Sequence, residues 1–241
     1  MILLIYPKDP TIRRIERHGK RIANSLPGVA KQIVIEPKDA SKTRAHHAIK
    51  ASEDGDLIVF MGHGRSDALF GARGDRYKDA EYVDYRVIEE NPELYYNDEN
   101  FIDGTTYRLF VGKKIVSFAC VSNELGKRLV NAGTKAALGF GKLPTTVAEF
   151  EDEWHYKKVK PNVAAAMSGI LDVSFGRALI RAVKQGGNMA DLAYCIKDEI
   201  HWHIAMLLYS KARYRYMLAD VLSAVEKAVV VSGDATLPLL G

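Results

Sequence analysis

The chain has 241 residues, 47% of them hydrophobic and 27% charged, which is the composition of a globular protein with enough apolar material for a core. Its 34 basic and 30 acidic residues leave a net charge of only +4, and no stretch is basic enough to require a nucleic-acid partner. We find no window with the ~20 apolar residues of a membrane helix, and the opening MILLIYPKDP lacks the features of a signal peptide. We therefore expect a cytoplasmic protein with no nucleic-acid and no membrane partner.

Short apolar runs alternate with amphipathic stretches in the first part of the chain, which is typical of parallel strands joined by crossover helices. The predicted strands cover residues 2–6, 31–36, 57–61, 115–119 and 134–140. The predicted helices cover residues 11–25, 40–53 and 123–132. This alternation predicts an α/β fold with a mostly parallel sheet and helices on both faces.

Two regions depart from that alternation. Residues 65–113 are charged and rich in tyrosine, and we interpret them as a long insertion of loops, with a hairpin and a final helix over about 100–110. From residue 145 onward the apolar spacing is helical, over about 163–184 and 189–231. We therefore assign residues 1–200 to one domain with a long insertion, and residues 201–241 to a C-terminal helical extension packed on that domain.

A histidine and a cysteine follow two of the predicted strands. His63 follows the strand over 57–61 in the segment IVFMGHG, and Cys120 follows the strand over 115–119 in the segment IVSFACVS. The carboxyl ends of parallel strands meet at one edge of a sheet, so both side chains are expected to face the same crevice. The glycines on either side of His63 allow the backbone to pass close to a substrate.

This pairing suits nucleophilic catalysis. A thiol needs a neighbouring imidazole to take its proton, and the oxyanion formed by its attack on a carbonyl needs backbone N–H donors, for which Cys120 and Gly64 are the candidates. A helix that begins near residue 123 and points its N-terminus at Cys120 favours the thiolate. A lone cysteine after an apolar strand is more often a small buried residue, and a lone histidine in a glycine turn is usually structural. The joint placement of the two residues favours catalysis.

The segments IVFMGHG and IVSFACVSNELGKRLVNAGTKAALGFG resemble the shared signature of the caspase-like (clan CD) cysteine peptidases, and bacterial CHAT-type members in particular. The histidine also precedes the cysteine at a spacing close to the roughly 50 residues known for caspases. The resemblance runs from about residue 1 to about residue 200. It implies a caspase-like three-layer sandwich and an endopeptidase that needs no cofactor. It also implies hydrolysis of protein or peptide substrates through a thioester, with Cys120 as nucleophile and His63 as base and acid.

Substrate preference is left open by the motifs. Members of that family recognise the substrate side chain with a charged residue in the first pocket, and nothing in the sequence identifies that residue here. Asp9 suits a basic side chain, whereas Lys8, Arg13 or Arg14 suits an acidic one. An acidic cluster favours basic substrates, although such a run is more typical of a solvated helix start; it comprises Glu149, Glu151, Asp152 and Glu153. We take Asp9, Glu149 and Asp152 as candidate substrate-binding residues.

Two other functions are alternatives to the peptidase. The chain suits an inactive caspase-like interaction module that uses the insertion and the helical tail as contact surfaces. An amidotransferase is less consistent with the sequence, because class I glutaminases place the cysteine before the histidine.

A metal site at His201 and His203 is not favoured, because residues two apart face different sides of a helix. If the peptidase needs control, we expect a regulatory partner chain to supply it. With only two cysteines, Cys120 and Cys195, we expect no disulfide framework.

Overall fold

A central sheet organises the protein. The computed structural model describes residues 1–152 and 154–241. The strands of the sheet lie in the order β2-β1-β3-β6-β7-β8, and all neighbours are parallel except β7 and β8. Their bounds are β1 Ile2–Pro7, β2 Ala30–Ile35, β3 Leu57–Met61, β6 Lys114–Phe118, β7 Ala136–Gly139 and β8 Val230–Gly233. The predicted α/β class and the mostly parallel sheet are therefore confirmed.

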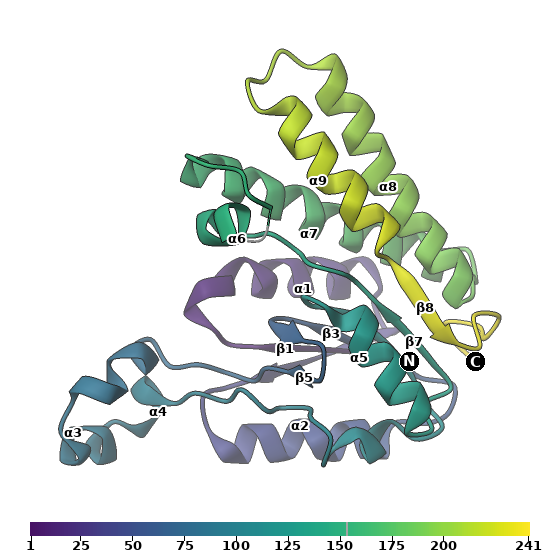
Figure 1. Ribbon diagram of the computed structural model, residues 1–241. Helices are drawn as coiled ribbons and strands as arrows, with labels where there is room; N and C mark the ends of the chain where they lie inside the picture. Colours follow the sequence, from purple (N-terminus) through teal and green to yellow (C-terminus); the bar gives the residue numbers. More distant parts are fainter. Residues whose placement is uncertain (153) are drawn as a thin grey trace.

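Helices cover both faces of this sheet and make a three-layer sandwich (Figure 1). One layer contains α1, α6, α7, α8 and α9; the other contains α2 and α5. Their bounds are α1 Arg13–Ser25, α2 Asp39–Ala51, α5 Ser122–Asn131, α6 Val147–Asp152, α7 Pro161–Lys184, α8 Met189–Tyr209 and α9 Arg215–Lys227. A 3-10 turn, η1 (Pro10–Ile12), leads into α1.

The alternation of side chains along the strands produces two separate cores. In β1 and β3, Leu4 and Val59 pack toward α1 and α7, whereas their neighbours Ile5 and Phe60 pack toward α2. All four side chains are at most 1% exposed. Strands buried on both faces read as continuous apolar runs, which is why the sequence identified them readily.

One helix, α7, is long and apolar enough to cross a membrane by length and composition alone. However, 61% of its most apolar window is buried inside the protein, and its main partners are α8 and α1. A core helix of a soluble protein passes the same test, and here the packing accounts for the apolar composition.

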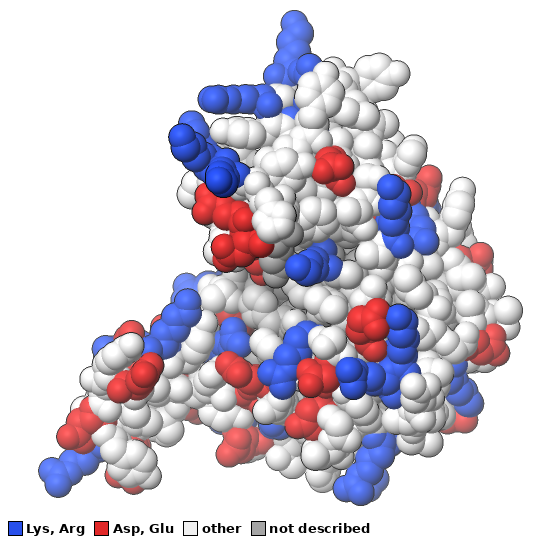
Figure 2. Space-filling model, in the orientation of Figure 1, with Lys and Arg blue, Asp and Glu red and all other residues white. Residues whose placement is uncertain are grey.

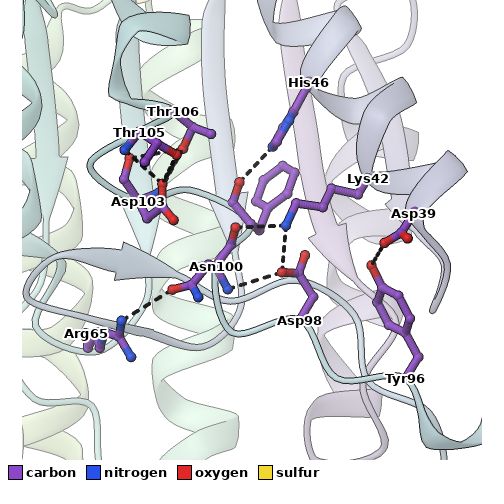
Figure 3. A network of polar contacts seen from close by, with 11 residues as sticks. Asp39, Lys42, His46, Arg65, Tyr96, Asp98, Asn100, Asp103, Thr105 and Thr106 are labelled. Carbon is purple, nitrogen blue, oxygen red and sulfur yellow. Dashed lines mark hydrogen bonds and ion pairs between the residues drawn. The ribbon is translucent and has the colours of Figure 1, made fainter.

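The insertion begins as a short hairpin and then forms a lobe beside α2 (Figure 1). Its elements are β4 Gly64–Arg65, β5 Ala68–Leu69, η2 Tyr77–Tyr82, α3 Tyr85–Glu90, α4 Pro92–Tyr95 and η3 Tyr107–Phe110. Polar contacts hold it to α2 (Figure 3). The Lys42 ammonium lies 2.8 Å from a carboxylate oxygen of Asp98, and the Tyr96 hydroxyl donates to Asp39 at 2.9 Å. The insertion is therefore packed against the domain.

The structure corrects two predicted helices. The helix expected over 100–110 is reduced to the turn η3, because Ile102 is extended and bridges to Leu69, and because Asp103 accepts hydrogen bonds from the backbone and hydroxyl of Thr105. The helix expected over 189–231 is divided into α8 and α9 and followed by strand β8. Residue 200, the expected end of the catalytic part, lies inside α8. Charges of both signs are interspersed over most of the face in Figure 2, in line with the small net charge.

Gly139 is expected to be essential for stability. It ends β7 against the first turn of α5, and a Cβ at this position would lie 2.3 Å from the carbonyl oxygen of Ser122. Gly139→Ala should therefore lower the free energy of unfolding by about 2–3 kcal/mol, as overpacking does. The matched control is Gly169→Ala in α7, where the Cβ meets open space; it should gain about 0.5–1 kcal/mol from helix propensity. Urea unfolding measures both, and equal stabilities would contradict this view of the β7–α5 contact.

Candidate active site

His63 lies just beyond β3, at the edge where the parallel strands end. The preceding Gly62 fits closely, because a Cβ there would lie 3.0 Å from both the ring of Phe60 and the side chain of Pro7. The N–H of Gly62 also donates to the carbonyl oxygen of Phe118 at the end of β6, at 3.1 Å. The turn that carries the histidine is thus bonded to the strand that precedes Cys120.

A hydroxyl relay orients the imidazole of His63. Its Nε2 lies 2.7 Å from Oγ1 of Thr11, and the same hydroxyl lies 2.6 Å from Oδ1 of Asp9. An ionised carboxylate only accepts, so the single proton of the hydroxyl points to Asp9, and Thr11 accepts from Nε2–H. This arrangement assigns the tautomer: Nε2 carries the proton, and Nδ1 is left as the basic nitrogen.

Asp9 is held firmly beneath the ring. Its side chain is fully buried, and Oδ1 also accepts from the backbone N–H of Thr11 at 2.8 Å. Oδ2 lies 3.8 Å from Nη1 of Arg73 and 4.0 Å from Nε2 of His63. Burial lowers the pKa of His63, and the charge of Asp9 opposes that shift. The imidazole is therefore neutral at neutral pH, which is the form that accepts a proton.

Cys120 occupies a tight turn between β6 and α5. The next residue, Val121, has φ 53° and ψ 23°, the left-handed conformation that a β-branched residue rarely adopts. The buried hydroxyl of Ser122 stabilises this turn: it lies 2.6 Å from the carbonyl oxygen of Ser117 and accepts from the N–H of Phe140 at 2.9 Å. Strained strand-to-helix turns of this kind often present a functional side chain.

The thiol and the imidazole line the same pocket. The pocket is small, with a volume of about 30 Å³, enough for a water molecule. The Sγ of Cys120 lies 3.5 Å from the carbonyl oxygen of Leu143. The pocket is lined by Ile12, Arg14, Ile15, Gly62, His63, Phe118, Cys120, Leu143, Thr145, Leu171 and Asp172. The structure therefore brings the two predicted catalytic residues to one site.

The second cysteine has a different environment. Cys195 is buried in α8, where its sulfur lies 3.3 Å from Nε of Arg181 in α7. Neither cysteine forms a disulfide. Cys195 is thus a packed core residue and serves as an internal comparison for Cys120.

Gly64 lies where an oxyanion donor is expected. It faces Leu69 across the β4–β5 hairpin, and the N–H of Leu69 donates to Ile102 on its other side. In antiparallel pairs bonded and non-bonded positions alternate, so the N–H of Gly64 points away from β5. A Cβ on Gly64 would lie 3.0 Å from the Cβ of Ala119, the residue that precedes Cys120. The assignment of Gly64 and Cys120 as oxyanion donors stays a prediction.

The predicted substrate-binding residues lie in different places. Asp9 is beneath the histidine, as described above. Glu149 accepts from the N–H groups of Thr145 and Thr146 at 2.6 and 2.8 Å, while its charge still raises the pKa of His63. Asp152 is exposed at the end of α6. Glu153 lies outside the described residues. Their role in binding a substrate is untested.

Sequence reasoning missed Thr11 and Asp172. Thr11 forms the relay between the histidine and Asp9. It belongs to the segment Pro-Thr-Ile, whose sequence is typical of a surface turn and gives no sign of a functional threonine. Asp172 enters the pocket from α7, where it is the only acidic residue of the helix. A single acidic residue within an apolar stretch of a helix is a signal that the sequence offered. Among the described residues, no three histidine, cysteine or acidic side chains are grouped so that they could hold a metal ion.

Comparison with known proteins gives little guidance. No family model matches the chain, and no curated protein matches it. A solved structure from Staphylococcus aureus, provisionally described as a phosphofructokinase, aligns over 96% of this chain and 98% of its own, with a TM-score of 0.36 and 9% identity. So low a score carries no argument about this chain.

The family assignment made from the sequence is therefore corrected. No family model and no curated protein matches the chain, and the structural neighbour named above gives no evidence for a caspase-like family. Two short motifs were too little to establish membership.

Proposed function

We propose that the chain is a cysteine endopeptidase that hydrolyses peptide bonds through a thioester on Cys120. The observation that carries the proposal is the single pocket at the carboxyl edge of the sheet that both His63 and Cys120 line. The relay through Thr11 and Asp9 adds to it, because it leaves Nδ1 of the imidazole as a base. A thiol beside an oriented neutral imidazole is the minimum that nucleophilic acyl transfer requires.

The reaction has two steps. Nδ1 of His63 takes the thiol proton as the sulfur of Cys120 attacks the carbonyl carbon, and the N–H groups of Cys120 and Gly64 stabilise the oxyanion. The C–N bond breaks as the imidazolium returns the proton to the leaving amine, which leaves a thioester. Water, deprotonated by the same imidazole, attacks the thioester, and the carboxylic acid departs as the thiol is restored.

The small pocket sets a condition for substrate entry. The cavity between the lining side chains is small, about 30 Å³, so a long substrate side chain requires some of them to move. We propose that the substrate is a protein or peptide that is cleaved after a basic residue. We also propose that a partner chain helps to open the pocket. A cytoplasmic, reducing location keeps the thiol usable.

Alkylation of the two cysteines tests the proposal. Iodoacetamide should modify Cys120 at pH 7 at least about 10-fold faster than Cys195, because the thiolate is the reactive form and His63 promotes it. His63→Ala should move the labelling of Cys120 to higher pH, while Cys195→Ala should leave it unchanged. Mass spectrometry of the labelled peptides gives both rates. Equal rates for the two thiols, or a rate that ignores His63→Ala, would exclude an activated nucleophile.

The small pocket also favours a second candidate, a non-catalytic interaction module. Its contact surfaces would be the insertion over residues 65–113 and the α8–α9 hairpin, which projects from the domain (Figure 1). An inert Cys120 in the alkylation experiment, together with intact folding, would support this candidate over the peptidase.

A further inference from the structure

A buried carboxylate in the same pocket is incompletely satisfied. Asp172 is 2% exposed and lines the pocket from α7. Its Oδ2 accepts from Nε of Arg14 at 2.6 Å, but Oδ1 has no hydrogen-bond partner among residues 1–152 and 154–241. Buried polar atoms are nearly always hydrogen-bonded, and a buried carboxylate oxygen without a donor is costly. Oδ1 is thus a vacant acceptor inside a reactive pocket.

The partner of Asp172 is able to leave. Arg14 belongs to α1 and lines the pocket, but its side chain is 28% exposed, whereas that of Asp172 is 1% exposed. His18 also faces the carboxylate, with its Nε2 3.7 Å from Oδ2, but burial lowers the pKa of this imidazole, which disfavours its cationic form. A long side chain at the edge of a pocket can move into solvent, whereas the aspartate is fixed within the core.

We propose that Asp172 binds the guanidinium or ammonium group of a basic side chain, and that Arg14 occupies this site in the resting protein. The ligand replaces one cation by another of the same chemistry, so the carboxylate stays paired throughout. An anionic ligand would instead have to approach a buried negative charge, which is unfavourable. Arg14 also lines this small pocket, so its departure enlarges the space that a ligand can occupy.

In the context of the proposed function, this site selects the substrate. Cys120 and Asp172 line one pocket, so a basic side chain held by the aspartate places the adjoining backbone beside the nucleophile. This part of the inference rests on the proposed peptidase activity. The binding of a cation does not, and the two are tested separately.

Binding is measured without catalysis, on a Cys120→Ala chain. Calorimetry with n-butylguanidinium, and with n-butylurea as its neutral analogue, should show binding of the cation alone. Adding Arg14→Gln should tighten it about 10-fold because the competing cation is removed, whereas Asp172→Asn should abolish it. Arg17→Gln, an exposed arginine on the same helix, is the matched control and should have no effect.

The decisive comparison is Arg14→Gln against its parent, which does not depend on the folding of Asp172→Asn. Equal affinity for the charged and neutral analogues in Arg14→Gln would overturn the proposal. So would n-butylguanidinium binding that persists unchanged in a folded Asp172→Asn chain.

Cleavage is then measured with the natural Cys120. Peptides with Arg, Gln or Asp before the scissile bond should be cleaved in that order of preference, with Arg favoured at least about 100-fold and the preference lost in Asp172→Asn. A Cys120-dependent preference for Asp would refute the cation site and leave the peptidase standing. Cation binding that depends on Asp172, without cleavage of any peptide, would support the site and refute the peptidase.

Discussion

Replacement of Cys120 by alanine is expected to abolish peptide hydrolysis, with kcat lowered about 10³-fold or more. The thiol is the side chain that forms the covalent intermediate of the proposed reaction, so no other side chain replaces it. His63→Ala should cause a loss of similar size, because a nucleophile and its base act as a unit. For the same reason the double variant should be little worse than either single one.

A panel of fluorogenic peptides ending in Lys, Arg or Asp measures these losses. Cys195→Ala is the matched control, since this cysteine is buried between α7 and α8 and should leave the activity unchanged. Far-UV circular dichroism and thermal unfolding establish that each variant is folded. Equal activity of the wild type, Cys120→Ala and His63→Ala would refute the catalytic assignment.

The parallel part of the sheet was predictable because its strands are buried on both faces. The expected strand over 57–61 has the observed bounds of β3, and the others agree with β1, β2, β6 and β7 to within about two residues. The edge strand β8 was not predictable. Residues 229–231 are three valines that continue the apolar character of α9, and only their pairing with β7 makes them a strand.

The insertion shows the opposite failure of local reasoning. Residues 100–110 contain enough apolar side chains for a helix, but Phe101 and Ile102 are at most 1% exposed because they pack into the core beside α2 in an extended segment. Tertiary contacts therefore overrode local preference. The contacts of Lys42 and His46 with this segment, drawn in Figure 3, come from a helix some fifty residues earlier in the chain and have no local signature.

The candidate site was predictable only where topology sufficed. His63 and Cys120 follow parallel strands that are neighbours in the sheet, so their convergence follows from strand order alone. Thr11 and Asp172 reach the site from a turn and a distant helix, and their roles depend on packing that no spacing encodes. The family assignment failed for a related reason: two short motifs describe a local geometry and do not establish descent.

Asp9→Asn is expected to lower kcat about 100-fold while leaving the fold intact. Asp9 is a positioning residue, because it acts through Thr11 and the imidazole; in a well-studied triad the comparable change costs about 10⁴-fold. Here the carboxylate lies 4.0 Å from Nε2 and a hydroxyl intervenes, so a smaller loss is expected. The amide keeps the size of the carboxylate but no longer compensates the imidazolium that forms during catalysis.

The pH profile separates this role from a merely structural one. His63 must be neutral to accept a proton, so kcat/KM is lost as the pH falls through its pKa, which burial places below the usual 6.5. Asp9 opposes that lowering, and Asp9→Asn should therefore move the acid limb to still lower pH. Asp75→Asn, at an exposed acid paired with Arg13, is the control and should leave both kcat and the limb unchanged. Thr11→Ser should retain the relay and most of the activity, whereas Thr11→Val should behave like Asp9→Asn in kcat. A carboxylate that is coupled to the imidazole must change the pH at which the ring takes up its proton. If kcat falls in Asp9→Asn but the acid limb does not move, Asp9 supports only the local fold.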